Sequence, residues 1–114
     1  MASKSAEEKE PVTRGTGNVF ADLGFPDAAE RQAKLRLASA LNQVLDGRKL
    51  SQEDAAKVLG VTQPKVSALR HYKVAGFSVE RLMNLLTALD QDVEIVILRK
   101  PRSRKSARIS VVAV

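Results

Sequence analysis

The stretch SQEDAAKVLGVTQPKVSALRH, residues 51–71, decides the fold that we predict for this chain. Ser51 is followed three residues later by Asp54, the pattern of a helix N-cap with its capping partner. This pattern predicts a short helix over 52–59. Gly60 follows at once and supplies the positive φ that a sharp turn requires.

The residues after that turn predict a second short helix. Thr62 is a favourable N-cap, and Pro64 falls in the first helical turn, where its missing N–H costs nothing. Val66 and Leu69 share one face, and Ala56 provides the small side chain that two crossing helices need. The combination is typical of a helix-turn-helix. We favour DNA binding over a purely structural pair of helices.

Two further helices are predicted around this unit. Asp27 with Glu30 predicts a helix over 27–46 that ends at Gly47, and Ser78 caps a fourth helix. Apolar residues recur along both at helical spacing and are expected in the core. These are Leu37, Ala38, Leu41, Val44 and Leu45 in the first helix, and Leu82, Leu85, Leu86 and Leu89 in the fourth.

Residues 92–98, DVEIVIL, are rich in β-branched side chains and predict a strand. A lone strand has unpaired backbone groups and needs a partner. That partner is a second copy of the strand, a sheet of another protein, or the strand-like residues 108–114. We favour a second copy, and expect Val93, Ile95 and Ile97 to form the dimerisation face.

The chain before the first helix has two parts. Residues 1–16 are polar and mixed in charge, so we expect a disordered tail. Residues 17–26 are more apolar and contain Phe20, Leu23 and Phe25. This segment either docks onto the helical core or binds a partner protein and becomes ordered on contact.

Positive charge gathers near the C-terminus. The formal net charge is +6, and residues 99–108 hold six basic residues and no acidic one. Residues 1–98 then hold 13 basic and 13 acidic residues and are neutral. The basic tail 99–114 is either solvated and disordered, or an arm that adds sequence-independent affinity for nucleic acid. Residues 55–79 are a second region with no acidic residue.

Several classes of protein are disfavoured by composition. The chain has no cysteine, no apolar run of about 18 residues and no secretory signal, so we expect a soluble, cytoplasmic protein. The single histidine, His71, has no carboxylate, nucleophile or second metal ligand at a motif spacing. We therefore expect no enzyme activity, no metal and no cofactor.

The run LSQEDAAKVLGVTQPKVSALR, followed by GFSVERLMNLLTALDQDVEIVI, resembles Xre-type (lambda-repressor-like) helix-turn-helix proteins. With GNVFADLGFPDA before the first helix, the chain more narrowly resembles the antitoxins of type II toxin–antitoxin systems that pair with RelE/ParE-like toxins. The resemblance covers about 17–98. It implies a mainly α fold, a lambda-repressor-like helical bundle over 27–98 whose C-terminal β-strand serves dimerisation.

This resemblance also implies a function. The implied protein is a homodimer that binds a palindromic operator in double-stranded DNA, represses its own operon and neutralises a co-encoded toxin. The alternative is a stand-alone phage-type transcriptional regulator without a toxin partner.

The family's base-contacting positions map onto Gln63, Pro64, Ala68 and His71, with Gln52 in the preceding helix. Pro64 departs from the family pattern, because its side chain has no hydrogen-bond donor. Neighbouring polar and basic residues suit phosphates better than bases. The expected DNA-contacting set is Gln52, Thr62, Gln63, Pro64, Lys65, Ser67, Ala68, Arg70 and His71.

Overall fold

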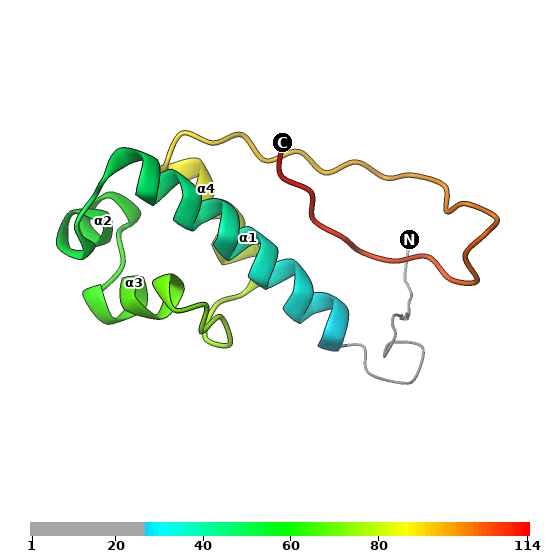
Figure 1. The fold of residues 1–114 in the computed structure, drawn as a ribbon, viewed down its shortest axis with the longest axis horizontal. Coiled ribbons are helices and arrows are strands. Elements are labelled where there is room, and N and C mark those ends of the chain that lie inside the picture. Colours follow the sequence, from blue (N-terminus) through cyan, green and yellow to red (C-terminus); the bar gives the residue numbers. More distant parts are fainter. Residues whose placement is uncertain (1–26) are drawn as a thin grey trace. The chain divides into compact units, whose positions relative to one another are not determined.

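Four α-helices and an irregular C-terminal segment make up the described part of the chain (Figure 1). The computed structural model describes residues 27–114. The helices are α1 (Asp27–Arg48), α2 (Gln52–Leu59), α3 (Gln63–Arg70) and α4 (Val79–Ala88). The predictions for residues 1–16 and 17–26, including Phe20, Leu23 and Phe25, lie outside the described residues.

The chain divides into two compact units. The helical unit comprises residues 34–94 together with Ala113 and Val114, and so contains most of α1 and all of α2, α3 and α4. Among the described residues, the second unit comprises 27–33 and 95–112. No helix of the described residues is long and apolar enough to cross a membrane.

Helices α2, α3 and α4 begin where the sequence predicts, because a side-chain oxygen caps each N-terminus. The bonds run from Asp54 N–H to Ser51 Oγ (3.1 Å), from Lys65 N–H to Thr62 Oγ1 (3.4 Å) and from Arg81 N–H to Ser78 Oγ (2.9 Å). Each bond satisfies one of the backbone donors that a helix leaves without a partner in its first turn.

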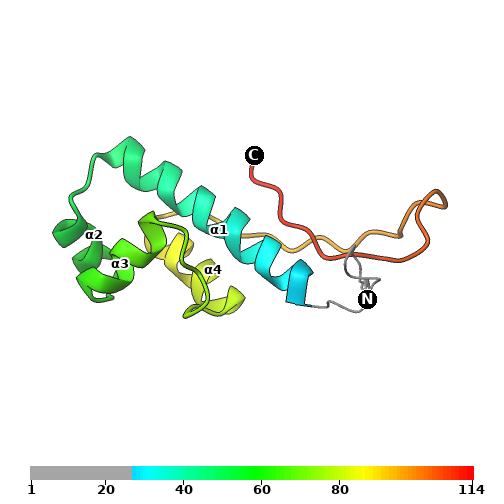
Figure 2. The ribbon, with the colours of Figure 1, turned by 60° about the horizontal axis from the view of Figure 1, so that its bottom comes forward.

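The predicted apolar stripes form the core of the helical unit. α2 packs against α3 and α4, and all three lie on one side of the α1 residues in this unit (Figure 2). Val44 lies half-buried at the edge of the α1 stripe. Val74 and Phe77, from the loop between α3 and α4, are also buried, although the sequence predicted only a loop there. The largest fully buried side chains are Leu41, Val66, Leu69, Leu82 and Leu89.

All four helices end in a residue with left-handed backbone conformation. These residues are Lys49 (φ 56°), Gly60 (φ 70°), Tyr72 (φ 60°) and Asp90 (φ 64°). The next residue then donates its N–H to the carbonyl five positions earlier, which is the Schellman motif. The four bonds are Leu50 to Leu45 (3.3 Å), Val61 to Ala56 (3.1 Å), Lys73 to Ala68 (2.8 Å) and Gln91 to Leu86 (3.0 Å).

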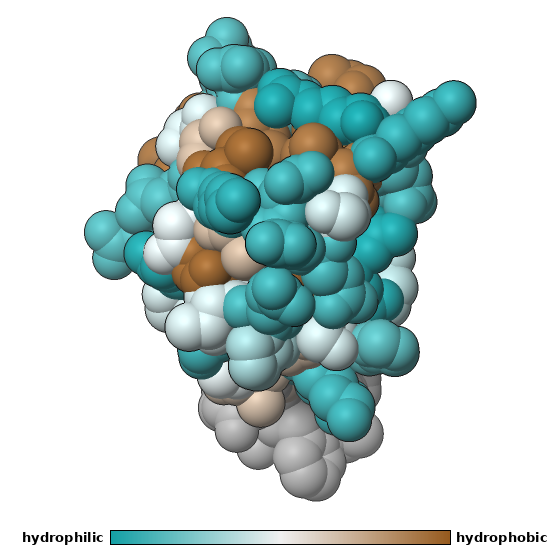
Figure 3. Space-filling view, turned by 90° about the vertical axis from the view of Figure 1, so that its left-hand side faces the viewer, coloured by the Kyte–Doolittle hydropathy of each residue, from teal (hydrophilic) through white to brown (hydrophobic). Residues whose placement is uncertain are grey.

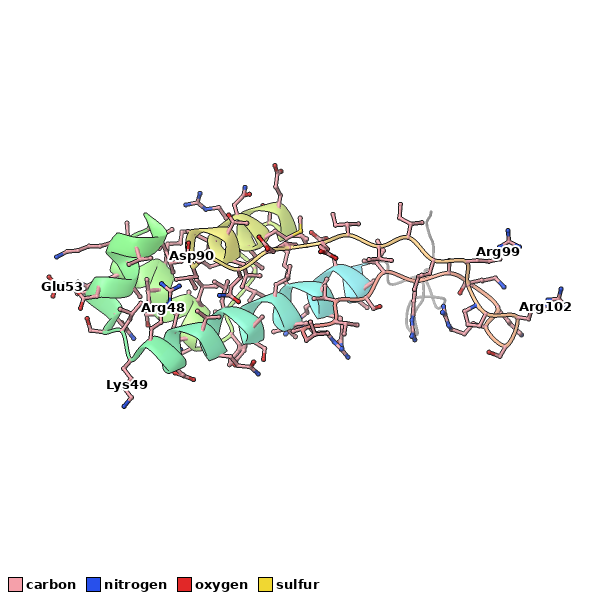
Figure 4. The ribbon with its side chains drawn as sticks, turned by 90° about the horizontal axis from the view of Figure 1, so that it is seen from above. Arg48, Lys49, Glu53, Asp90, Arg99 and Arg102 are labelled. Carbon is pink, nitrogen blue, oxygen red and sulfur yellow. The ribbon has the colours of Figure 1, made fainter. Side chains whose placement is uncertain are left out.

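The predicted end of α1 at Gly47 is wrong. α1 continues to Arg48, and Lys49 instead of the glycine adopts the left-handed conformation. The longer helix lets Arg48 Nη2 donate to the carbonyl of Leu89 at 2.6 Å, near the side chain of Asp90 (Figure 4). A cation is favourable at the C-terminus of α4, where the helix dipole places partial negative charge. This contact helps offset the strain of about 1–2 kcal/mol that the left-handed conformation costs at Lys49.

Gly47→Ala is therefore expected to stabilise the protein by about 0.5–1 kcal/mol, because glycine inside a helix is less favourable than alanine. No atom lies within 4 Å of a Cβ built at Gly47, so the methyl group fits without strain. The measurement is urea-induced unfolding at fixed protein concentration. Gly60→Ala is the matched control, and its positive φ of 70° predicts a loss of about 1–2 kcal/mol. Equal effects of the two substitutions would contradict the assigned end of α1.

The structure does not contain the β-strand predicted over 92–98. No strand occurs between Gln91 and Val114, and residues 108–114, the partner within the chain, are irregular as well. A strand exists only where a neighbour accepts its backbone hydrogen bonds. Ile95 and Ile97 are 76% and 88% exposed. Pairing with a second copy stays a prediction.

Candidate nucleic-acid interface

Helix α3 is held by its inner face and presents its first turn to solvent. Val66 and Leu69 are completely buried. The residues that open the helix, Gln63, Pro64 and Lys65, are exposed, as is the capping residue Thr62. Pro64 occupies the N-terminal turn without breaking it, since no intrahelical partner is available to its backbone nitrogen there. The exposed turn therefore combines an amide, an apolar ring and a cation.

The turn between α2 and α3 sets the position of this helix. Gly60 (φ 70°, ψ 31°) donates its N–H to the carbonyl of Ala56 at 2.8 Å. Ala56 is buried, which lets the two helices approach each other closely. Gln52 opens α2 directly after its cap and is exposed, as Gln63 is in α3. Both predicted base-contacting glutamines thus stand at exposed helix starts.

Lys65 is held by the loop after α3. Its Nζ atom lies 4.9 Å from the centre of the Phe77 ring and 3.5 Å from the carbonyl oxygen of Gly76. The side chain remains exposed. A cation over an aromatic face is attracted by the negative electrostatic potential of the ring, so the ammonium group has a preferred position before any nucleic acid arrives.

Arg70 lies differently from the other predicted contacts, because its guanidinium faces α1. Nη1 donates to the backbone oxygen of Asn42 at 3.2 Å and to its Oδ1 at 3.1 Å, and Nη2 pairs with Asp46 Oδ1. Asn42 is buried and donates from Nδ2 to the carbonyl of Leu69 at 3.0 Å. These contacts tie the C-terminal end of α3 to α1, so Arg70 is at least a positioning residue for α3.

Asn42 and Asp46 were not predicted from the sequence to be part of the site. A signal was available for Asn42, since it stands four residues after Ala38 and three before Leu45, both in the predicted core stripe. A polar residue at such a position needs a hydrogen-bond partner. No comparable signal marks Asp46, which is exposed and differs little from any surface carboxylate in sequence.

His71 caps the C-terminus of α3. Its Nδ1 lies 2.8 Å from the carbonyl oxygen of Ser67. A carbonyl only accepts, so Nδ1 carries a hydrogen and Nε2 is the nitrogen left for another partner. The ring is exposed, whereas Ser67 and Ala68 are half-buried. His71 is therefore more accessible to a ligand than Ser67 and Ala68, which are also on the predicted contact list.

The end of the helical unit that carries α2 is mostly hydrophilic, with small apolar areas between polar side chains (Figure 3). Within the acid-free region 55–79, the side chains of Lys57, Lys65 and Lys73 are all exposed. The charge of Arg70 is partly neutralised by Asp46, so Arg70 adds less to the positive electrostatic potential of this region. No cluster of three or more metal-ligating side chains occurs within the described residues.

The residues predicted for dimerisation do not meet at one site within the described chain. Val93 is half-buried, whereas Ile95 and Ile97 are exposed. Val96 and Leu98, on the opposite side of the predicted strand, are 70% and 81% exposed, so both sides of this segment are open in a single chain.

Two capped helices joined by a glycine turn, the second with a buried inner face and an exposed polar start, define a helix-turn-helix. The comparisons with known proteins agree. The chain belongs to the family described as helix-turn-helix domain, whose model matches residues 19–98.

A solved structure named as an XRE family transcriptional regulator is 73% identical to the chain, with a TM-score of 0.74. The match covers 78% of this chain and 100% of that chain. No curated protein matches the sequence significantly.

Proposed function

We propose that this protein is a sequence-specific DNA-binding transcriptional repressor that inserts α3 into the major groove of its operator. The observation that carries the proposal is the exposed, acid-free start of α3 on a helix whose other face is completely buried. A recognition helix of this class reads base edges with its N-terminal residues. The family and the similar regulator support DNA-binding transcriptional regulation.

Gln63 is the residue that we assign to base recognition, by bidentate hydrogen bonding to an adenine. Gln52, Ala68 and His71 are the further base contacts of the proposal, and Pro64 supplies an apolar contact, for example to a thymine methyl group. Phosphate contacts fall to Thr62, Lys65 and Ser67, because donors of this kind position the protein on the backbone. Arg70 reaches a phosphate only through donors that Asn42 and Asp46 leave unused.

Gln63→Ala is expected to reduce the discrimination between operator and random DNA by about 1–3 kcal/mol, because one bidentate base contact is lost. The measurement is fluorescence anisotropy with a duplex taken from upstream of the gene and a random duplex of equal length. Lys65→Ala is the matched comparison. It is expected to weaken binding to both duplexes and to reduce the slope of log affinity against log salt concentration (the salt slope) by about 1. If neither substitution changed binding to the upstream duplex, the assignment of α3 as the recognition helix would be wrong.

We further propose a cytoplasmic homodimer that binds a palindromic operator, with pairing of Val93, Ile95 and Ile97 between subunits. The exposed β-branched segment supports this, because unpaired backbone and apolar surface favour addition of a strand. Sedimentation velocity of the DNA complex tests the proposal. One chain per operator duplex would contradict it.

Neutralisation of a co-encoded toxin is the second candidate function, and the same exposed apolar segment favours it. Phe20, Leu23 and Phe25 remain the other proposed docking residues. Co-expression with the adjacent reading frame tests this function. A stable complex with a small RelE/ParE-like protein is the expected result, and failure to co-purify would favour a stand-alone regulator.

A further inference from the structure

The basic tail contains a turn that is closed by its own hydrogen bonds. Arg104 donates its N–H to the carbonyl of Pro101 at 3.2 Å. Lys100 Nζ donates to the carbonyl of Arg104 at 2.8 Å, and Arg104 Nη1 to that of Ser106 at 3.2 Å. Two of the six basic residues of 99–108 thus bond backbone carbonyls within the turn. The segment has local structure, although it has neither helix nor strand.

The other four basic residues, Arg99, Arg102, Lys105 and Arg108, are exposed. Arg99 and Arg102 point away from the chain (Figure 4). Residues 95–114 include no acidic side chain, and no ion pair involves these four within the described part of the chain. Four cations within the ten residues 99–108 therefore repel one another, and an external anion relieves the repulsion.

The charge distribution of the whole chain indicates which anion fits. Phosphate neutralisation by lysine and arginine supplies essentially all non-specific affinity for DNA and attracts the protein to it. Residues 1–98, which contain the entire helix-turn-helix, have no net charge. The net charge of +6 lies in the tail, beyond residue 98 where the family model ends. Residues 1–98 taken together are thus neutral, and the tail supplies the net positive charge that can attract DNA over a long range.

We propose that Arg99, Arg102, Lys105 and Arg108 form a second DNA-binding site, which contacts the phosphates of duplex DNA independently of sequence. This inference rests on the proposed function of α3. Base reading then belongs to the helical unit, and much of the salt-dependent affinity belongs to these four cations in and beside the turn at 101–106. Lys100 and Arg104 close the turn and act as positioning residues.

The test replaces the four cations by glutamine in the full chain (Arg99→Gln, Arg102→Gln, Lys105→Gln and Arg108→Gln) and measures binding between 50 and 200 mM salt. The probes are the duplex from upstream of the gene and a random duplex of equal length. We expect the slope of log affinity against log salt to fall by about 3–4 per chain, because each lost phosphate contact contributes about 0.9. Affinity should fall by the same factor for both duplexes, and the ratio between them should not change.

Two matched double variants control for charge alone. Arg99→Gln with Arg102→Gln should reduce the slope by about 2, whereas Arg31→Gln with Arg81→Gln, two exposed cations outside the tail, should leave it nearly unchanged. Circular dichroism and thermal unfolding should be the same for every variant, since the replaced side chains are exposed.

The possible failures are distinguishable. If the unmodified protein bound the two duplexes equally, the proposed function of α3 would fail. If it discriminated between them but the quadruple variant kept its salt slope, only the tail site would be wrong. Binding to phosphatidylglycerol vesicles that is lost in the quadruple variant, with an unchanged DNA slope, would assign the cations to a membrane surface and overturn the proposal.

Discussion

Leu69→Ala is expected to lower the free energy of unfolding by about 2–5 kcal/mol, the largest effect of any substitution that we predict. Leu69 is completely buried on the inner face of α3, and its backbone carbonyl accepts the hydrogen bond of Asn42. Alanine removes the apolar contacts and leaves a cavity. The cavity stays open because the capped ends of α3 limit how far the helix can move to fill it. A small domain has only about 5–15 kcal/mol of stability in total, so part of the population should unfold near physiological temperature.

Urea unfolding followed by circular dichroism, at one fixed protein concentration, measures this loss. Val58→Ala is the control, because Val58 is an apolar helical residue that is 42% exposed. Its replacement should change stability by no more than about 0.5 kcal/mol. If both substitutions had similar effects, Leu69 would not be the buried anchor of α3.

Asn42→Ala is expected to cost about 1–3 kcal/mol, because a buried hydrogen-bonding group loses its partners. The substitution removes the donor to the carbonyl of Leu69 and the acceptor Oδ1 for Arg70. The expected loss is smaller than that of Leu69→Ala, since Tyr72 N–H also donates to the carbonyl of Leu69 and the backbone oxygen of Asn42 remains for Arg70. Gln43→Ala, at the neighbouring exposed position of α1, should change stability by no more than about 0.5 kcal/mol.

A double-mutant cycle with Arg70→Met isolates the contact between Arg70 and Asn42. In the Arg70→Met background, Asn42→Ala should cost about 1 kcal/mol less than in the unmodified protein. The same variant separates two roles of Arg70. If Arg70 only positions α3, Arg70→Met lowers stability and leaves the salt slope of DNA binding unchanged. If Arg70 contacts a phosphate, Arg70→Met reduces that slope by about 1. A reduced slope with unchanged stability would show that the contacts with α1 contribute little.

The helix starts and inner faces were predictable from sequence, because both depend on residues close together in the chain. Ser51, Thr62 and Ser78 each bond an N–H three residues ahead, so the capping signal and the structure involve the same few residues. Leu82 and Leu89 are buried as the 3.6-residue period predicts. The exposed start of α3, and with it most of the candidate site, follows from the same local rules.

The end of α1 was not predictable in this way. Gly47 is the residue that sequence favours for a left-handed helix end, yet Lys49 adopts that conformation. The contacts that support the longer helix come from residues distant in sequence, since Arg48 reaches the carbonyl of Leu89 across 41 positions. The burial of Val74 and Phe77 was also not predictable, because core residues in a loop belong to no helical or strand periodicity.

By itself, the sequence determined the helix-turn-helix, its caps, its turn at Gly60 and the concentration of charge beyond residue 98, since these depend on short-range hydrogen bonds and on composition. Only the tertiary structure decided that Arg70 faces Asn42 and Asp46 rather than open solvent, and that residues 92–98 have no strand partner among residues 27–114. The physical reason is common to both findings. A guanidinium group and an extended backbone segment form hydrogen bonds with whichever partners lie close to them in the folded chain. The sequence alone does not show which residues those are.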